Sequence, residues 1–185
     1  MSAVGARKPM AQEFDLDQVD FITIDTIGPP GQRTFHLQAG QGTRLLTLTI
    51  EKEQASALAD SIASLLEEIA AKFHRTTQPP IPQPDLELHE PILPAFRVAQ
   101  MGIGYDSDAD RLVLVLNELL AEGVSAEPST ARLVATREQM LALAEHTRMV
   151  VASGRPICRN CGRPIDPDGH FCPNSNGHRK PVPWG

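Results

Sequence analysis

The organisation of this chain is set by Leu48-Thr-Ile-Glu-Lys-Glu-Gln-Ala-Ser-Ala-Leu-Ala59, where the apolar spacing changes from that of a strand to that of a helix. A second stretch lines up with it, Leu133-Val-Ala-Thr-Arg-Glu-Gln-Met-Leu-Ala-Leu-Ala144. Both place Glu-Gln at the helix start and Ala-Leu-Ala one turn later. The match predicts that the chain repeats one structural unit.

The first unit is predicted from a run of strands followed by a helix. Residues 20–27, 33–38 and 44–50 alternate between apolar and polar side chains, which is typical of short strands. From Glu51 to Phe73 the apolar residues recur at helical spacing, which predicts an amphipathic helix of about 20 residues. The apolar face of that helix comprises Ala55, Leu58, Ile62, Leu65, Leu66 and Ile69.

The same order of elements returns in the second half. Strand-like patterns occupy residues 96–104, 111–120 and 130–135, and a helical pattern follows at 137–152. Thr136 and Gln139 fit a capping box at the start of this second helix. We therefore predict an α+β fold of two pseudo-repeated βββα units, residues 18–75 and 95–154, which share one core. The alternative is a chance similarity of two helix starts, which the matched order of all the elements disfavours.

Three further segments flank these units. Residues 1–17 are expected to form a flexible N-terminus. Residues 76–94 contain six prolines, and because Pro lacks a backbone donor and favours extended conformations, they are predicted to be a linker laid over the surface. Residues 155–185 are predicted to be a separate tail with a zinc knuckle.

Composition limits the class of protein. Of the 185 residues, 41% are hydrophobic and only 4% are aromatic, so the core must be aliphatic. The formal net charge of −6 argues against a general nucleic-acid coat protein. The charge is uneven, because residues from Arg155 onward carry five Lys or Arg and two Asp. The basic tail fits either an anionic partner or a solvated tail on an acidic body.

The compartment is inferred from what the sequence lacks. No apolar run approaches the roughly 20 residues of a membrane span, so no membrane partner is expected. Arg7 and Lys8 are followed by acidic residues rather than by an apolar segment, which disfavours a secretory signal. We therefore expect a cytoplasmic protein, in which three cysteines favour metal or redox chemistry over structural disulfides.

All three cysteines lie in the tail, at spacings that suit a zinc ion. Cys158 and Cys161 form a C-x₂-C pair, and His170 and Cys172 form an H-x-C pair that presents both side chains on one face of an extended segment. Four protein ligands fill a tetrahedron, which indicates a structural zinc rather than a catalytic one. His178 is the alternative fourth ligand. A redox dithiol and unmodified thiols are the other interpretations of the cysteines.

The sequence gives less support for a ligand pocket than for the metal site. Arg33 and Arg111 each open the second strand of their unit, and a pocket between the two halves would be lined by Arg33, Arg111 or His36. The acidic run 106–110 lacks the glycine and glutamate of a calcium loop and is predicted to be a solvated turn. No Ser-His-Asp set or close carboxylate pair can be argued from spacing, so no catalytic residue is assigned.

The chain resembles a known family. The run 31–39 (Gly-Gln-Arg-Thr-Phe-His-Leu-Gln-Ala), the segment 50–54 and the tail motif between Gly154 and Gly177 are similar to an uncharacterised actinobacterial family of conserved hypothetical proteins, domain of unknown function 3090. The resemblance covers nearly the whole chain and implies a cytosolic actinobacterial protein. It assigns no activity to the chain. Family members are expected to carry Tyr in place of His178, which supports His170 as the ligand.

Two functions from different classes follow. The first is a non-enzymatic binding or adaptor protein with a structural zinc site, whose partner is expected to be a protein. The exposed end 181–184 (Pro-Val-Pro-Trp) supports this hypothesis. The alternative is an enzyme or a small-ligand-binding domain with a pocket between the two repeats. Binding of single-stranded nucleic acid by the knuckle is a third and weaker hypothesis. The oligomeric state is left open.

Overall fold

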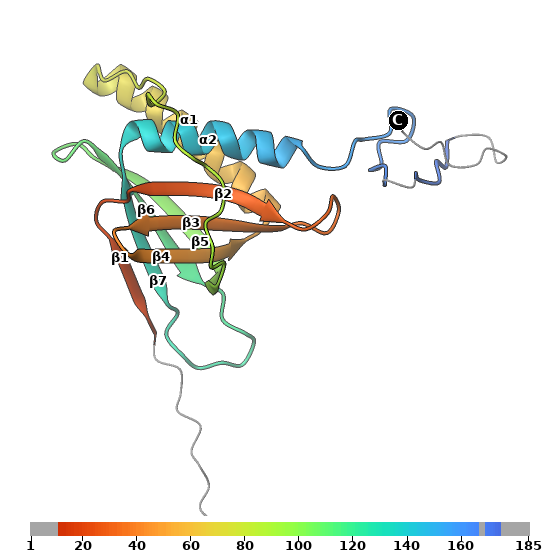
Figure 1. Ribbon diagram of the computed structural model, residues 1–185, viewed down its shortest axis with the longest axis horizontal. Coiled ribbons are helices and arrows are strands. Elements are labelled where there is room, and N and C mark those ends of the chain that lie inside the picture. Colours follow the sequence, from red (N-terminus) through yellow and green to blue (C-terminus); the bar gives the residue numbers. More distant parts are fainter. Residues whose placement is uncertain (1–10, 167–168, 175–185) are drawn as a thin grey trace, which may run out of the picture.

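The structure, a computed structural model, describes residues 11–166 and 169–174 and has a mixed α+β fold (Figure 1). Its elements are β1 (Glu13–Leu16), β2 (Phe21–Ile27), β3 (Thr34–Gln41), β4 (Arg44–Ile50), α1 (Lys52–Phe73), β5 (Pro94–Asp106), β6 (Arg111–Glu118), β7 (Thr130–Ala135) and α2 (Arg137–Ala152). Apart from β1, each was predicted from apolar spacing, with ends that differ by three residues at most. The prediction that the halves are repeats of one unit stays a prediction.

All the strands belong to one seven-stranded sheet, in the order β1-β7-β6-β5-β4-β3-β2. Antiparallel hairpins build β2–β4 and β5–β7, and the two groups join through a parallel pairing of β4 with β5. That joint is short and irregular, with Thr47 opposite Pro94 and Thr49 opposite Arg97. The two groups of strands differ in direction: in Figure 1, β2–β4 lie across the view, while β5–β7 run steeply behind them.

The edge strand β1 corrects the prediction of a flexible segment 1–17. Glu13–Leu16 pairs in parallel with β7, and Leu16 is 1% exposed in the core. Just beyond it, the N–H of Val19 donates to the carbonyl of Val134 at 3.0 Å. Burial of Leu16 and Val19 holds this segment to the sheet. Residues 1–10 lie outside the described part of the chain.

Both helices begin with a capping box, and in each the glutamine makes a second contact. The side chain of Gln54 accepts a hydrogen bond from the N–H of Glu51, and its amide donates to the carbonyl of Val98 at 3.1 Å. The side chain of Gln139 accepts from the N–H of Thr136, as predicted, and its amide donates to the carbonyl of Val19 at 2.9 Å. Each glutamine therefore fixes a helix start and also bonds it to a segment from the other half of the chain.

The core is aliphatic and draws on both halves, as the composition predicts. Side chains exposed by less than 2% come from the strands of each half and from both helices, and include Leu37, Leu48, Ile62, Leu114, Leu133, Met140 and Leu143. The helix α2 packs against β2 and against α1. Within the described residues, no helix is both long and apolar enough to cross a membrane.

The proline-rich stretch has a defined place. Residues 79–94, called the covering segment below, lie over the outer face of β2 and β3, which explains why β3 is buried on both faces. The side-chain amide of Gln38 donates to the carbonyl of His89 at 2.8 Å, and its oxygen accepts from the N–H of His89 at 2.7 Å. The ring of His89 stacks on Phe21 at a centroid separation of 4.2 Å. Phe21 in turn covers Gly40, where an added Cβ would lie 2.3 Å from the ring.

An ion-pair network closes the turn between β5 and β6. Asp110 accepts hydrogen bonds from Arg137 at 2.8 Å and from the hydroxyl of Tyr105 at 2.7 Å, and lies 3.5 Å from Arg75. The hydrogen bonds from Arg137 and Tyr105 lower the pKa of Asp110 from 3.8 to about 2. The network joins the end of α1, the start of α2 and the β5–β6 turn.

Replacing Asp110 by Asn should destabilise the protein by about 1 kcal/mol at neutral pH, a figure reduced because the carboxylate is partly solvated. Asn tolerates the left-handed backbone of this residue, so the change isolates the charge. Since the pKa is lowered on folding, the stabilisation is present above about pH 4 and is lost as the pH falls towards 2. Urea unfolding at several pH values measures it. An equal difference between the two proteins at pH 7 and at pH 2 would contradict the assignment.

Replacing Gln38 by Ala should lower the free energy of unfolding by about 1–3 kcal/mol, because it leaves the backbone groups of His89 without partners over the sheet. Amides of the covering segment should also exchange faster with deuterium. The matched control is Gln100→Ala, on the exposed face of β5, with an expected change within about 0.5 kcal/mol. Equal losses in the two variants would argue against a specific bond.

Candidate metal centre

The first half of the candidate centre is a tight turn that follows α2. The N–H of Gly162 donates to the carbonyl of Cys158 at 2.8 Å, and the N–H of Cys158 donates to the carbonyl of Arg163 at 2.8 Å. Gly162 has a φ of 70°, a left-handed conformation that glycine adopts without strain. The turn brings the side chains of Cys158 and Cys161 to the same side, as two ligands of one ion require.

The second half is an extended segment that begins after another glycine turn. Gly169 has a φ of 96°, and its N–H donates to the carbonyl of Asp166 at 2.8 Å. His170 and Cys172 follow, separated by one residue, so both side chains leave the same face of the chain. The segment 156–174 is called the knuckle below. Figure 1 shows it beyond the end of α2, away from the sheet.

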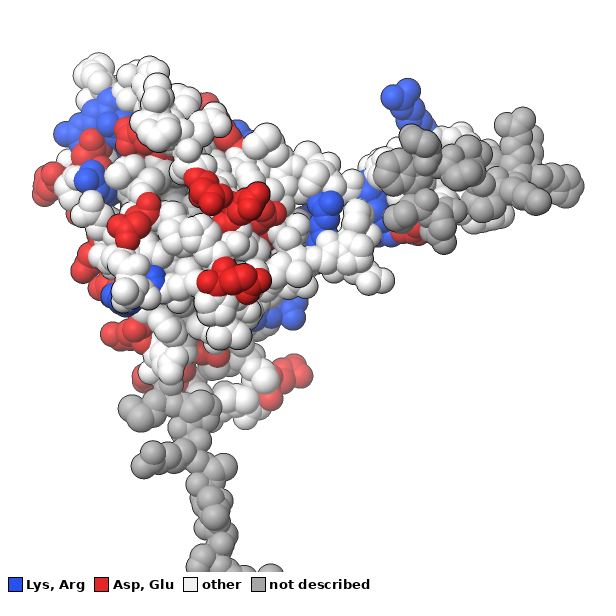
Figure 2. Space-filling view, viewed as in Figure 1, with Lys and Arg blue, Asp and Glu red and all other residues white. Residues whose placement is uncertain are grey.

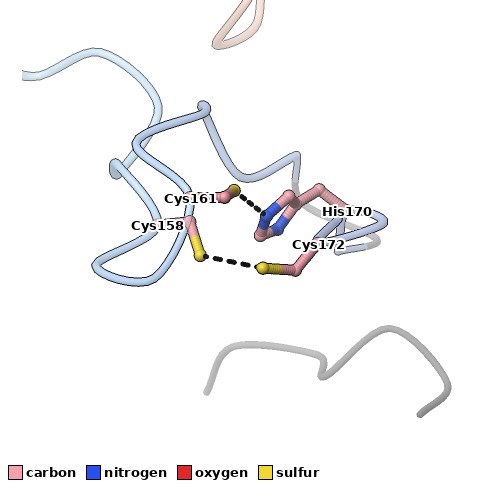
Figure 3. Close-up of side chains that lie close together, drawn as sticks. All are labelled: Cys158, Cys161, His170 and Cys172. Atoms are coloured by element: carbon pink, nitrogen blue, oxygen red, sulfur yellow. Dashed lines mark hydrogen bonds between the residues drawn. The ribbon is translucent and has the colours of Figure 1, made fainter. Parts of the chain in front are cut away.

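The four side chains converge as the sequence predicts (Figure 3). The ligand atoms of Cys158, Cys161, His170 and Cys172 all lie within 4.8 Å of one another. The sulfurs of Cys158 and Cys172 are 3.9 Å apart, against about 3.8 Å for two thiolates on one tetrahedral zinc. The sulfur of Cys161 lies 3.2 Å from Nε2 of His170, somewhat closer than the roughly 3.6 Å of the ideal geometry. The residues present fit a tetrahedral ion.

The electrostatics of the thiols differ from one to another. At Cys161 the N–H of Arg163 favours the thiolate, but burial and the neighbouring thiols outweigh it and raise the pKa. At Cys172 burial opposes ionisation, but hydrogen bonds from the N–H of Asn174 and from the other two thiols together lower the pKa. The cluster therefore holds one thiol with a raised pKa, Cys161, beside one with a lowered pKa, Cys172. A divalent cation would favour the thiolate form of all three.

Two asparagines support the cluster, and the sequence analysis did not identify them. The amide of Asn160 donates to the sulfur of Cys172 at 3.4 Å. The amide of Asn174 donates to the carbonyl of Asn160 at 2.7 Å. These bonds join the C-x₂-C turn to the H-x-C segment, as outer residues around metal ligands commonly do. Their positions in the sequence could have indicated this role, because Asn160 lies between the first two cysteines and Asn174 follows the last one.

The knuckle is also held to the body by contacts of residues 153–155, called the neck below. Arg155 forms an ion pair with Asp166 of the knuckle, and its side chain packs on Gly31, where an added Cβ would lie 2.9 Å from Nε. Arg33 donates to the hydroxyl of Ser153 at 2.8 Å. The turn between β2 and β3 therefore contacts the base of the knuckle.

The three residues proposed for a pocket do not meet. Arg33 lines a pocket of about 510 Å³ between the body and the knuckle, whose lining includes neither Arg111 nor His36. Arg111 belongs to the β5–β6 turn, where it donates to the carbonyl of Asp110 at 3.0 Å. His36 is 6% exposed within β3, and burial lowers its pKa, which favours the neutral ring. His178, the alternative metal ligand, and the end 181–184 lie outside the described residues.

One comparison with known proteins gives a match. A family model described as "Protein of unknown function (DUF3090)" matches residues 14–172, which is most of the chain and includes all four residues of the cluster. No curated protein and no solved structure matches the chain.

Replacing Cys161 by Ser should reduce the zinc content from one ion per chain to none, because it removes one of the four ligands. Metal analysis of the purified protein measures this. The thermal unfolding of the body should change little, since the knuckle contributes nothing to the described core cluster. Wild-type protein that is stably folded but purified without zinc would contradict the assignment.

The fourth ligand is decided by a matched pair of histidine variants. His170→Ala should lose the ion or bind it much more weakly, while His178→Ala should keep one ion per chain. The reverse result would assign His178 to the site.

Proposed function

We propose that this chain, which belongs to the DUF3090 family of proteins of unknown function, is a non-enzymatic binding protein in which a structural zinc ion shapes a surface for a protein partner. The observation that carries the proposal is the convergence of Cys158, Cys161, His170 and Cys172. A Cys₃His set favours zinc over hard cations such as calcium or magnesium, which prefer oxygen ligands. Thiolate ligands also suit a reducing compartment, for which we propose the cytoplasm.

The role of the ion is structural in this proposal. Four protein ligands leave no coordination position for a water molecule or a substrate, which catalytic zinc requires. The knuckle also contributes no residue to the described core cluster. A segment of this size needs a metal to hold one conformation. The zinc therefore stabilises the knuckle rather than performing a reaction.

The surface for the partner would be the exposed apolar side chains of the knuckle. Phe171 stands between two ligands, His170 and Cys172, and is 74% exposed. Ile157 precedes the first ligand and is 58% exposed. Aromatic residues are rare in this chain, and an exposed phenylalanine held between two metal-binding residues is suited to anchor a protein interface.

We also propose that the two halves arose by duplication of a βββα unit. The support is the equal order of elements, β2–β4 with α1 and β5–β7 with α2, and the equal use of Gln54 and Gln139 at the helix starts. On this view the halves provide a rigid platform, and the partner-binding part was added at the end of α2.

Affinity isolation from the native host tests the partner surface. A protein retained by the wild-type chain should be lost with Phe171→Ala, because this change removes the aromatic anchor, and with Cys161→Ser, because the knuckle loses its metal. Phe171→Ala should still bind one zinc ion per chain, which separates the surface from the metal site.

The matched control is Leu93→Ala, since Leu93 is 73% exposed but lies on the covering segment, remote in sequence from the knuckle. This variant should retain the partner. The adaptor proposal fails if Phe171→Ala keeps the partner as well as the wild type does. It also fails if nuclease treatment releases what is bound, because the ligand would then be nucleic acid.

A further inference from the structure

A pocket of about 510 Å³ lies between the body and the knuckle, within the size range of small-molecule sites. Its lining brings together segments that are far apart in the sequence. They are the β2–β3 turn, the end of β4 with the start of α1, the start of β5, the end of α2, and the neck with the knuckle. Figure 2 shows Lys and Arg side chains at the junction of the body and the knuckle, whereas acidic side chains predominate on the visible face of the body.

Cationic side chains outnumber acidic ones in this lining. Four are cationic (Arg33, Lys52, Arg97 and Arg155) and two are acidic (Glu51 and Glu53). Three of these six are already engaged, since Arg97 is bonded to Glu51 and Arg155 is bonded to Asp166 outside the pocket. Glu51 additionally accepts a hydrogen bond at the start of α1 through its capping box. The remaining charges are two cations and one carboxylate.

Arg33 and Lys52 are the two cations available to a ligand. Arg33 donates to the neutral hydroxyl of Ser153, and in residues 11–166 and 169–174 neither Arg33 nor Lys52 forms an ion pair. The ammonium of Lys52 reaches the neck, because a Cβ added at Gly154 would lie 3.3 Å from its Nζ. Two cations from different elements therefore meet at one concave surface. Glu53, the remaining carboxylate of the lining, forms no ion pair with either of them within the described residues.

The rest of the lining adds a polar and an apolar part. Lys52 and Glu53 belong to the first turn of α1, and the N-terminus of a helix carries a partial positive charge. Apolar side chains complete the pocket, from Phe35 and Ile50 in the sheet, Val150 in α2 and Ile157 in the knuckle. A matching ligand has an anionic head and an apolar body.

We propose that this pocket binds a small organic phosphate, with the phosphate held by Arg33 and Lys52 and the organic part packed on the apolar side chains. A guanidinium presents paired donors that match phosphate oxygens, and an ammonium adds a compact charge. The volume suits a small molecule rather than a nucleic-acid strand. The pocket shares Ile157 with the proposed partner surface but does not include Phe171, so the two sites can be tested separately.

Calorimetric titration of phenyl phosphate into the full-length, metal-bound protein tests the inference, with inorganic phosphate and benzoate as comparison ligands. Phenyl phosphate should bind more tightly than either, because it alone combines a phosphate with an apolar group. Lys52→Ala should weaken its binding about tenfold or more, the usual effect of losing a charged hydrogen bond. The matched control is Lys72→Ala, an exposed lysine in the last turn of the same helix, which should bind as the wild type does.

Arg33→Ala should weaken binding in the same way, but it also removes the bond to Ser153, so the Lys52 variant is decisive. Arg111→Ala and Phe171→Ala should leave the affinity unchanged, and the latter separates this result from a failure of the adaptor proposal. The inference is overturned if Lys52→Ala binds phenyl phosphate as tightly as the wild type. It is equally overturned if benzoate binds as well as phenyl phosphate, or if no binding is detected at about 10 mM.

Discussion

The arrangement of this protein depends on two glutamine side chains at the helix starts. Gln54 closes the capping box of α1 and also bonds to Val98 in β5, while Gln139 does the same for α2 and bonds to Val19 before β2. The start of α1 is therefore fixed to a strand of the second half, and the start of α2 is fixed to the segment that precedes β2. The direct joint between the halves is a short, irregular pairing of β4 with β5. The glutamines supply bonds across the halves that this pairing lacks.

Most of the helices and strands could be predicted because apolar spacing is a local property. The strands 44–50 and 130–135 and the helix 137–152 have the bounds that the pattern predicts. The strand β1 was missed, because only Leu16 of its four residues is buried and the flanking acids resemble a solvated terminus. The position of the covering segment could not be predicted either. It follows from bonds between His89 and Gln38, and a proline-rich stretch has no period that indicates its partner.

The metal ligands could be predicted because the C-x₂-C and H-x-C spacings are local in the sequence and typical of zinc sites. The pocket could not, because it depends on how the neck folds back onto the β2–β3 turn. Arg111 was grouped with Arg33 by its equivalent position in the second half. Figure 1 shows the β2–β3 and β5–β6 turns on opposite sides of the molecule, because three strand positions of a twisted sheet separate them. No feature of the sequence distinguishes Lys52 from the other lysines, and its approach to Gly154 is visible only in the structure.

The strand β1 also determines how the sheet meets other molecules. The sheet ends at β2, which packs against α2, and at β1, where a further strand could add. The strand β1 offers only four residues, and Asp15 is exposed there and bonded, together with Asp17, to Arg132 of β7. Short, charged edges resist strand addition, which is the first step of aggregation in many β-rich proteins. The edge strand β1 is thus a poor template for uncontrolled self-association.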